Sequence, residues 1–123
     1  MTVLDSNVII RVMKGDKSTL EAVKSLSDVV GTTVFNVYEI LRSKYSSKVS
    51  QYFEEIVIYP FTIKEAVIAS HIYRELSSRG KVKGEVDILI SSIVKANNET
   101  LITYDRDFYD ISKVSKINVE ILD

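Results

Sequence analysis

Short apolar runs alternate with longer amphipathic segments from one end of the chain to the other. The short runs predict β-strands at residues 2–5, 29–33, 56–59, 101–104 and 118–122. The amphipathic segments predict helices at residues 6–14, 16–27, 35–44, 47–55, 62–78 and 86–97, with 86–97 as the last full helix. Strands that alternate with helices are typical of a parallel sheet covered on both faces. We therefore expect an α/β fold of three layers with a central parallel sheet of four to five strands.

Apolar spacing also predicts which helix faces are buried. In the second and third helices, the residues expected to face inward are Leu20, Val23 and Leu26, and Val37, Ile40 and Leu41. Glu39 then lies beside the buried stripe of its helix. Ser6 is expected to cap the first helix, and Gly15 is expected to stop it.

Four carboxylates lie where predicted strands or helices turn toward one edge of the sheet. Asp5 and Asp105 directly follow short apolar strands, while Glu39 and Asp87 lie on helices. Ligands of open α/β sheets bind in the crevice beyond the carboxyl ends of the strands. Two carboxylates about 4 Å apart repel by about 4 kcal/mol at an effective dielectric near 20. A cluster of these acids therefore needs protons or a cation to persist.

The residue types at this edge favour a hard cation. Mg²⁺ and Mn²⁺ prefer carboxylate oxygens and water, and the predicted site has no Cys or His beside it. Such an ion activates a water and stabilises charge on a phosphodiester without a side-chain nucleophile. Each acid also has a structural interpretation: Asp5 as an N-cap, Asp87 as a partner of the helix dipole, Glu39 as an exposed helix residue and Asp105 as a turn residue. The shared site is favoured because all four fall at the same end of the predicted sheet.

Length and composition indicate one cytoplasmic domain spanning residues 1–123. A chain of 123 residues with 46% hydrophobic residues can bury a single core. Its 16 basic and 17 acidic residues give a net charge of -1, so net charge predicts neither nucleic-acid nor membrane binding. The absence of Cys excludes disulfides, thiolate zinc sites and cysteine nucleophiles. No apolar run approaches the roughly 18 residues of a membrane span.

A basic stretch between two glycines precedes Asp87. Arg79, Lys81 and Lys83 belong either to a solvated loop or to a loop that contacts phosphates. The single histidine, His71, is expected as a packing or surface residue of the helix at 62–78 rather than as a general base.

Four stretches, in order and with matching spacing, resemble a PIN domain. They are LDSNVII (4–10), NVYEIL (36–41), DILISS (87–92) and LITYDRDF (101–108). More narrowly, the chain resembles the VapC toxins of prokaryotic toxin-antitoxin modules over essentially its whole length. Ser91 and Ser92 replace alanines that are common in such proteins, and small residues there still allow close packing. The resemblance implies a metal-dependent endoribonuclease that cuts single-stranded or structured RNA.

The resemblance also implies roles for individual residues. The catalytic residues and ligands of Mg²⁺ or Mn²⁺ would be Asp5, Glu39, Asp87 and Asp105. Asn7 and Thr103 would orient these ligands. Asp107 is expected as a solvent-facing or outer acid, with direct ligation as the alternative. Independently of the resemblance, the basic loop flanks the proposed cleft, so Arg79, Lys81 and Lys83 are expected to hold the RNA backbone.

Partners follow mainly from the resemblance, which implies a homodimer silenced by a VapB-like antitoxin covering the acid cleft. The helices at 47–55 and 62–78 carry many large apolar residues, which fits either an interface or a thick core: Tyr52, Phe53, Val67, Ile68, Ile72, Tyr73 and Leu76.

Other classes of protein also place acids at the ends of parallel strands, and the sequence fits them to different degrees. A phosphoacceptor receiver domain fits poorly, because it needs an acid where Pro60 and Phe61 stand. A phosphatase resembling haloacid dehalogenases needs an Asp at Asn7. A PIN-like module that binds RNA or protein without cutting, and a PIN ribonuclease without an antitoxin, are the stronger alternatives.

Overall fold

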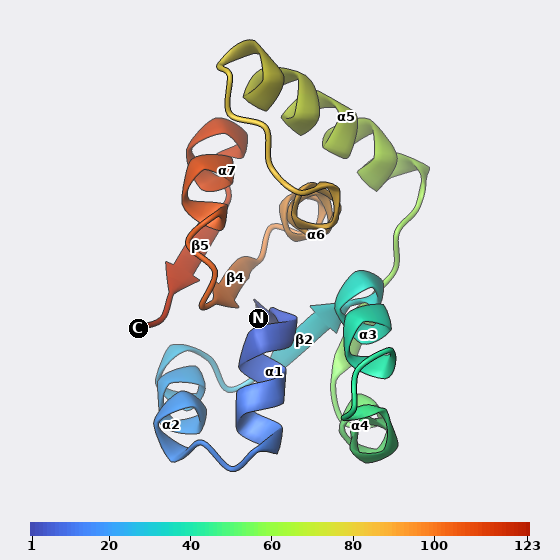
Figure 1. Ribbon diagram of the computed structural model, residues 1–123, viewed down its shortest axis with the longest axis vertical. Helices are drawn as coiled ribbons and strands as arrows, with labels where there is room; N and C mark the ends of the chain where they lie inside the picture. The colour runs from blue at the N-terminus through green and yellow to red at the C-terminus, as the bar shows by residue number, and fades with distance from the viewer.

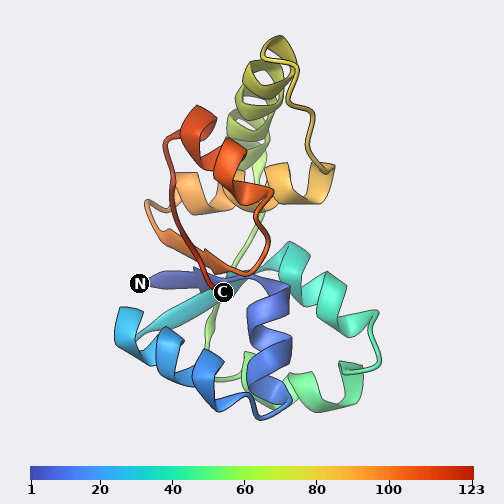
Figure 2. The same cartoon turned by 60° about the vertical axis from the view of Figure 1, so that its left-hand side comes forward.

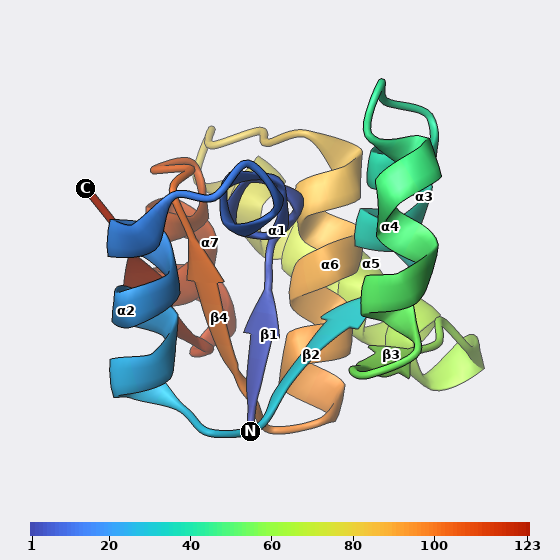
Figure 3. The ribbon, with the colours of Figure 1, turned by 90° about the horizontal axis from the view of Figure 1, so that it is seen from below.

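A computed structural model describes the backbone of residues 1–123 and every side chain except that of Lys48. Its single sheet has the strand order β3-β2-β1-β4-β5, and every neighbouring pair is parallel. The strands are β1 (Thr2–Leu4), β2 (Val30–Thr33), β3 (Val57–Tyr59), β4 (Thr100–Thr103) and β5 (Asn118–Ile121). In Figure 3 the arrows of β1, β2 and β4 run side by side in one direction, so their carboxyl ends share one edge.

Helices cover both faces of this sheet. They are α1 (Ser6–Met13), α2 (Lys17–Leu26), α3 (Val34–Leu41), α4 (Ser46–Phe53), α5 (Ile63–Ser78), α6 (Glu85–Ala96) and α7 (Phe108–Ser115). Figures 1 and 2 show α5, α6 and α7 on one side of the sheet and α1 to α4 on the other. The predicted three-layer α/β fold is therefore confirmed. No helix in the described part of the chain is both long and apolar enough to cross a membrane.

Two apolar cores follow from the alternation of side chains along the central strands. Val3 and Leu101 pack with α5, α6 and α7, whereas Leu4 and Ile102 pack with the helices of the other face. Ser91 and Ser92 are fully buried in α6, and their hydroxyls donate to the carbonyls of Asp87 and Leu89 at 2.8 and 2.6 Å. Both serines therefore pack closely without leaving a buried hydroxyl unpaired.

The expectation that the helix at 86–97 is the last one is wrong, because α7 follows β4. This helix is only eight residues long, and three of those residues are serine or aspartate, which are weak helix formers. Tertiary packing stabilises it instead: Phe108 and Ile111 are completely buried in the core beneath α5 and α6.

Two expected buried faces are also partly wrong. Leu20 and Leu26 of α2 are 38% and 42% exposed, and Leu41 of α3 is 49% exposed. The strands are three or four residues long, and α2 packs on α1 rather than across the sheet. Of the six apolar residues expected to face inward, only Val23 and Ile40 are therefore buried.

The beginnings of α1 and α3 are fixed by polar side chains at the carboxyl ends of β1 and β2. Asp5, not Ser6, caps α1, because its carboxylate accepts the Ser6 backbone N–H at 2.9 Å. Thr33 caps α3 by accepting the Asn36 backbone N–H at 3.3 Å. Gly15 ends the α1 turn with a φ of +86°, as expected from the sequence. These caps bring both helix starts to one sheet edge.

Candidate metal centre

Asp5 lies at the corner between β1 and α1, and it is buried. Four donors reach its carboxylate: Thr103 Oγ1 at 2.6 Å, Asn36 Nδ2 at 2.8 Å, the Ser6 N–H at 2.9 Å and Asn7 Nδ2 at 3.3 Å. Burial raises the pKa of the Asp5 carboxyl above its ordinary value, and the hydrogen bonds only partly offset this. Asp5 is thus both an N-cap and an acid held rigidly at the sheet edge.

Glu39 is tied to the same corner through Ser6. The Ser6 hydroxyl donates to Glu39 Oε1 at 2.7 Å and accepts a hydrogen bond from Asn36 Nδ2 at 3.0 Å. Asn36 is completely buried, and its Oδ1 accepts the Thr33 hydroxyl at 2.7 Å. Asn36 and Glu39 are three residues apart in α3, so they share a helix face. That face connects α3 to Asp5.

A second group of acids comes from α6 and the turn after β4. One carboxylate oxygen each from Asp87, Asp105 and Asp107 lies within 4.8 Å of the other two. Thr103 Oγ1 accepts the Asp105 N–H at 3.0 Å, and Asp105 Oδ1 accepts the Asp107 N–H at 2.9 Å. The turn therefore directs both of its acids toward the first turn of α6, where Asp87 stands.

Asp87 experiences all of these charges. Burial raises the pKa of its carboxyl to about 7, with further contributions from Asp105, Asp5, Glu39 and Asp107, in that order. No donor among the described residues forms a hydrogen bond with the Asp87 carboxylate that would offset this rise. The two groups of acids therefore form one electrostatic site.

The donor set of this site fits a hard divalent cation. Its ligand atoms are carboxylate oxygens, which Mg²⁺ and Mn²⁺ prefer, and no Cys or His belongs to the cluster. Asp87, Asp105 and Asp107 are near enough to share one ion. An ion among them would also relieve the repulsion that raises the Asp87 pKa.

The structure places two of the four predicted ligands, Asp87 and Asp105, in one group with Asp107, whereas Asp5 and Glu39 lie outside that group and are linked to each other through Ser6. Asn7 and Thr103 donate to the Asp5 carboxylate, and Asn7 Oδ1 also accepts the Tyr104 N–H at 3.2 Å. Asp107 is 64% exposed at its side chain, yet one oxygen lies beside Asp87 and Asp105. Its assignment as an outer acid or as a direct ligand stays a prediction.

Sequence reasoning expected Ser6 only as a helix cap and gave Asn36 no role in the site, although both residues link Asp5 to Glu39. A signal was present in the sequence. Asn36 precedes Glu39 by three residues on a helix that starts at a strand end, and Ser6 directly follows Asp5. A polar residue on the inward face of a short helix needs buried partners, and here the partners are the site acids.

The basic residues before α6 all have acidic partners. Arg79 is 3.7 Å from Glu75, Lys81 is 3.7 Å from Asp110, and Lys83 is 3.0 Å from Asp110. The Arg79 and Lys81 side chains are 60% and 52% exposed, whereas that of Lys83 is 18% exposed. Contact of these residues with RNA stays a prediction, and Lys83 differs from the other two in its burial.

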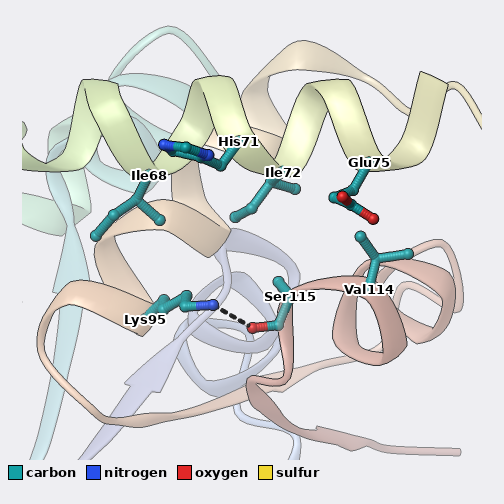
Figure 4. A pocket seen from close by; sticks show the side chains of 7 residues that line it. All are labelled: Ile68, His71, Ile72, Glu75, Lys95, Val114 and Ser115. Atoms are coloured by element: carbon teal, nitrogen blue, oxygen red, sulfur yellow. Dashed lines mark hydrogen bonds between the residues drawn. The ribbon is translucent and has the colours of Figure 1, made fainter. Parts of the chain in front are cut away.

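A separate hollow of about 210 Å³ lies between α5, α6 and α7, and Figure 4 shows it with His71 on its wall. Lys95 Nζ donates to the Ser115 carbonyl at 2.7 Å inside it. His71 is exposed, and its Nδ1 is 3.2 Å from an Arg74 guanidinium nitrogen. None of the clustered acids lines this hollow. His71 is therefore a surface residue outside the acid site.

Comparison with known proteins agrees with this fold. The PIN domain family model matches residues 2–114, and the chain belongs to that family. It is similar to ribonuclease VapC3 of Methanocaldococcus jannaschii, with 28% identity over 91 residues that cover 74% of this chain and 95% of the relative. The predicted resemblance to PIN domains and VapC proteins is confirmed.

Solved structures share the fold at lower sequence identity. A chain of VapBC2 from Rickettsia felis, bound to a promoter DNA fragment, superposes with a TM-score of 0.83 at 21% identity, covering 99% of this chain and 98% of that one. A chain of DNA-bound VapBC from Salmonella typhimurium gives a TM-score of 0.80 at 16% identity, covering 98% of each.

Proposed function

We propose that this protein is a VapC-like endoribonuclease that hydrolyses RNA with the help of Mg²⁺ or Mn²⁺. Membership of the PIN family and similarity to a VapC ribonuclease support the reaction class. One structural observation supports the metal dependence more than any other. Oxygens of Asp87, Asp105 and Asp107 lie within 4.8 Å of one another, and the pKa of Asp87 is raised to about 7.

In this proposal Asp5, Glu39, Asp87 and Asp105 hold the ion, with Asp107 as an additional or outer acid. When bound, the ion supplies an activated water and stabilises charge on the phosphodiester. Thr103, Asn36 and Asn7 keep the Asp5 carboxylate oriented by hydrogen bonds. The Ser6 hydroxyl does the same for Glu39. Asp87 must lose its proton to act as a ligand, so a proton and the cation compete for this carboxylate.

Basic residues beside the acids supply contact with the RNA backbone. Arg79 and Lys81 are the more exposed of the three loop cations, and their acidic partners are surface residues at 3.7 Å. Exposed pairs of this kind are weak, about 0–1 kcal/mol. Phosphates of the RNA can therefore replace Glu75 and Asp110 as partners of these two cations.

The test is incubation of the purified chain with single-stranded RNA in the presence of Mn²⁺, Mg²⁺ or EDTA. We expect cleavage with either ion and none with EDTA. RNA binding without cleavage in both metal arms would instead identify a PIN-like module that binds without cutting. Cleavage that persists in EDTA and in Asp87→Asn would contradict the proposed mechanism.

We also propose that the chain forms a homodimer. Val67 and Tyr73 remain 51% and 47% exposed on α5, and Tyr52 is 36% exposed on α4 on the other side of the sheet (Figure 1), while Ile72 and Leu76 are buried in the core. A shallow hollow between α5 and α6 lies beside Tyr73. Exposed aromatic and aliphatic groups of this kind favour an interface. Light scattering of the wild type should give about twice the monomer mass. The Tyr73→Glu variant should give the mass of a monomer.

An antitoxin is the second proposed partner. The structures that share this fold include VapBC proteins, some of them bound to DNA. A VapB-like protein that covers the acid cleft would inhibit cleavage. Co-purification from the native host should recover it. Recovery of the chain alone and active would instead support a PIN ribonuclease that works without an antitoxin.

A further inference from the structure

Lys83 is the cation nearest the three clustered acids in the described part of the chain. Its ammonium lies 3.0 Å from Asp110 and 3.8 Å from Asp107, and its side chain is 18% exposed. The hydrogen bond with Asp110 raises the pKa of the Lys83 ammonium and lowers the pKa of the Asp110 carboxyl. Both groups are therefore charged at neutral pH.

This ion pair joins two segments that both supply acids to the site. Lys83 stands four residues before Asp87, in the loop that enters α6, and Asp110 lies in the first turn of α7, three residues after Asp107. The same ammonium contacts Asp107, whose oxygen is within 4.8 Å of Asp87 and Asp105. The pair thus holds the α6 entry against the turn that carries Asp105 and Asp107.

We propose that Lys83 is a positioning residue that draws the Asp107 carboxylate into the metal site, and that Asp110 acts by anchoring Lys83. This rests on the proposed metal-dependent function. It assigns Lys83 a role different from that of Arg79 and Lys81, which face solvent. The Asp107 side chain is mostly exposed. Among the described residues, Lys83 is the one side chain that pairs with its carboxylate and can hold it over the site.

The sign of one effect separates positioning from simple electrostatics. A lysine close to a cation site repels the cation, so removing its charge should tighten metal binding if charge alone matters. If Lys83 positions Asp107, its removal frees that carboxylate to move into solvent, and metal binding weakens. Residues that orient metal ligands typically change affinity by about 10–100-fold when mutated.

The test measures Mn²⁺ affinity of the RNA-free protein by isothermal titration calorimetry. We expect Lys83→Met to weaken Mn²⁺ binding about tenfold and Lys83→Arg to retain most of the affinity. Lys24→Met is the control, since it removes the same charge from an exposed position on α2, away from Asp107 and Asp110. We expect it to bind Mn²⁺ within about twofold of the wild type.

A double-mutant cycle then shows whether Lys83 acts through Asp107. In an Asp107→Asn background, Lys83→Met should cause no further loss. Equal or tighter binding by Lys83→Met, or losses that simply add, would overturn the inference. If Lys83→Met does not fold, Asp110→Asn serves in the same cycle with the same expected outcomes. A wild-type protein that binds no Mn²⁺ would refute the proposed function itself. If the wild type binds Mn²⁺ and cuts RNA, but Lys83→Met binds Mn²⁺ as tightly as the control variant does, this inference alone is refuted.

Discussion

Asp5 and Asp87 face the same edge of the sheet, but the protein surrounds the first with hydrogen-bond donors and gives the second none among the described residues. Four donors fix the Asp5 carboxylate, at 2.6 to 3.3 Å. Asp87 has only burial and neighbouring carboxylates, which raise its pKa to about 7. Hydrogen bonds from the fold therefore fix the position of the Asp5 carboxylate. The Asp87 carboxylate has no such partner, and a proton or a cation can fill that role.

The largest effect should be on catalysis, where both acids are needed. Asp5→Asn and Asp87→Asn should each lower Mn²⁺-dependent RNA cleavage by about 100-fold or more, since even residues that only orient metal ligands change affinity 10–100-fold. Asp28→Asn removes an exposed acid and serves as the control. Rates of cleavage from time courses on a labelled RNA measure the effect. A near-wild-type rate in either site variant would show that its carboxylate is dispensable.

The donors around Asp5 should matter for stability. Asn36→Ala removes a buried amide that bonds Asp5, Ser6 and Thr33, and should lower the free energy of unfolding by about 1–3 kcal/mol. Asn118→Ala, at an exposed position of β5, should change it by less than about 0.5 kcal/mol. Urea denaturation gives both values. Equal stability of the two variants would mean that the Asp5 network contributes little.

Asp87 should make the stability of the metal-free protein fall as the pH rises. Its pKa is 3.8 in an ordinary setting and about 7 in the fold, so the folded state holds the proton more tightly. The contribution of Asp87 is therefore fully present below about pH 4 and is lost as the pH rises toward and through 7. We expect the Tm of the metal-free protein, relative to that of Asp87→Asn, to fall between pH 5 and pH 8. Parallel Tm profiles for the two proteins would show that the fold does not raise the pKa of Asp87.

The smallest effect should come from the exposed loop cations. Replacing Arg79 and Lys81 with Ala would remove the two proposed phosphate contacts, and should flatten the salt dependence of RNA binding by about 1.4 in log-log slope. The pair Lys17→Ala and Lys24→Ala, exposed on α2, controls for net charge. Fluorescence anisotropy at several salt concentrations measures the slopes. Identical slopes in the two double variants would leave the loop without a specific role.

Much of the fold was predictable, because alternating apolar runs and amphipathic segments mark each strand and most helices. Helix α7 was missed since two turns with weak helix formers depend on buried Phe108 and Ile111 rather than on local propensity. The positions of Asp5 and Asp105 were predictable because strand ends share one edge. Asn36 and the inward position of Lys83 were not, since each depends on contacts between segments distant in sequence.

Mn²⁺ binding to the RNA-free protein at pH 8, measured by calorimetry and by Tm, tests the cation site most directly. We expect the wild type to bind Mn²⁺ and to gain thermal stability, because the ion supplies the partner that Asp87 lacks. Asp87→Asn should start with a higher Tm than the metal-free wild type and gain little from Mn²⁺. A wild type that binds no Mn²⁺, or an Asp87→Asn variant that binds it equally well, would contradict the claim that these acids form a cation site.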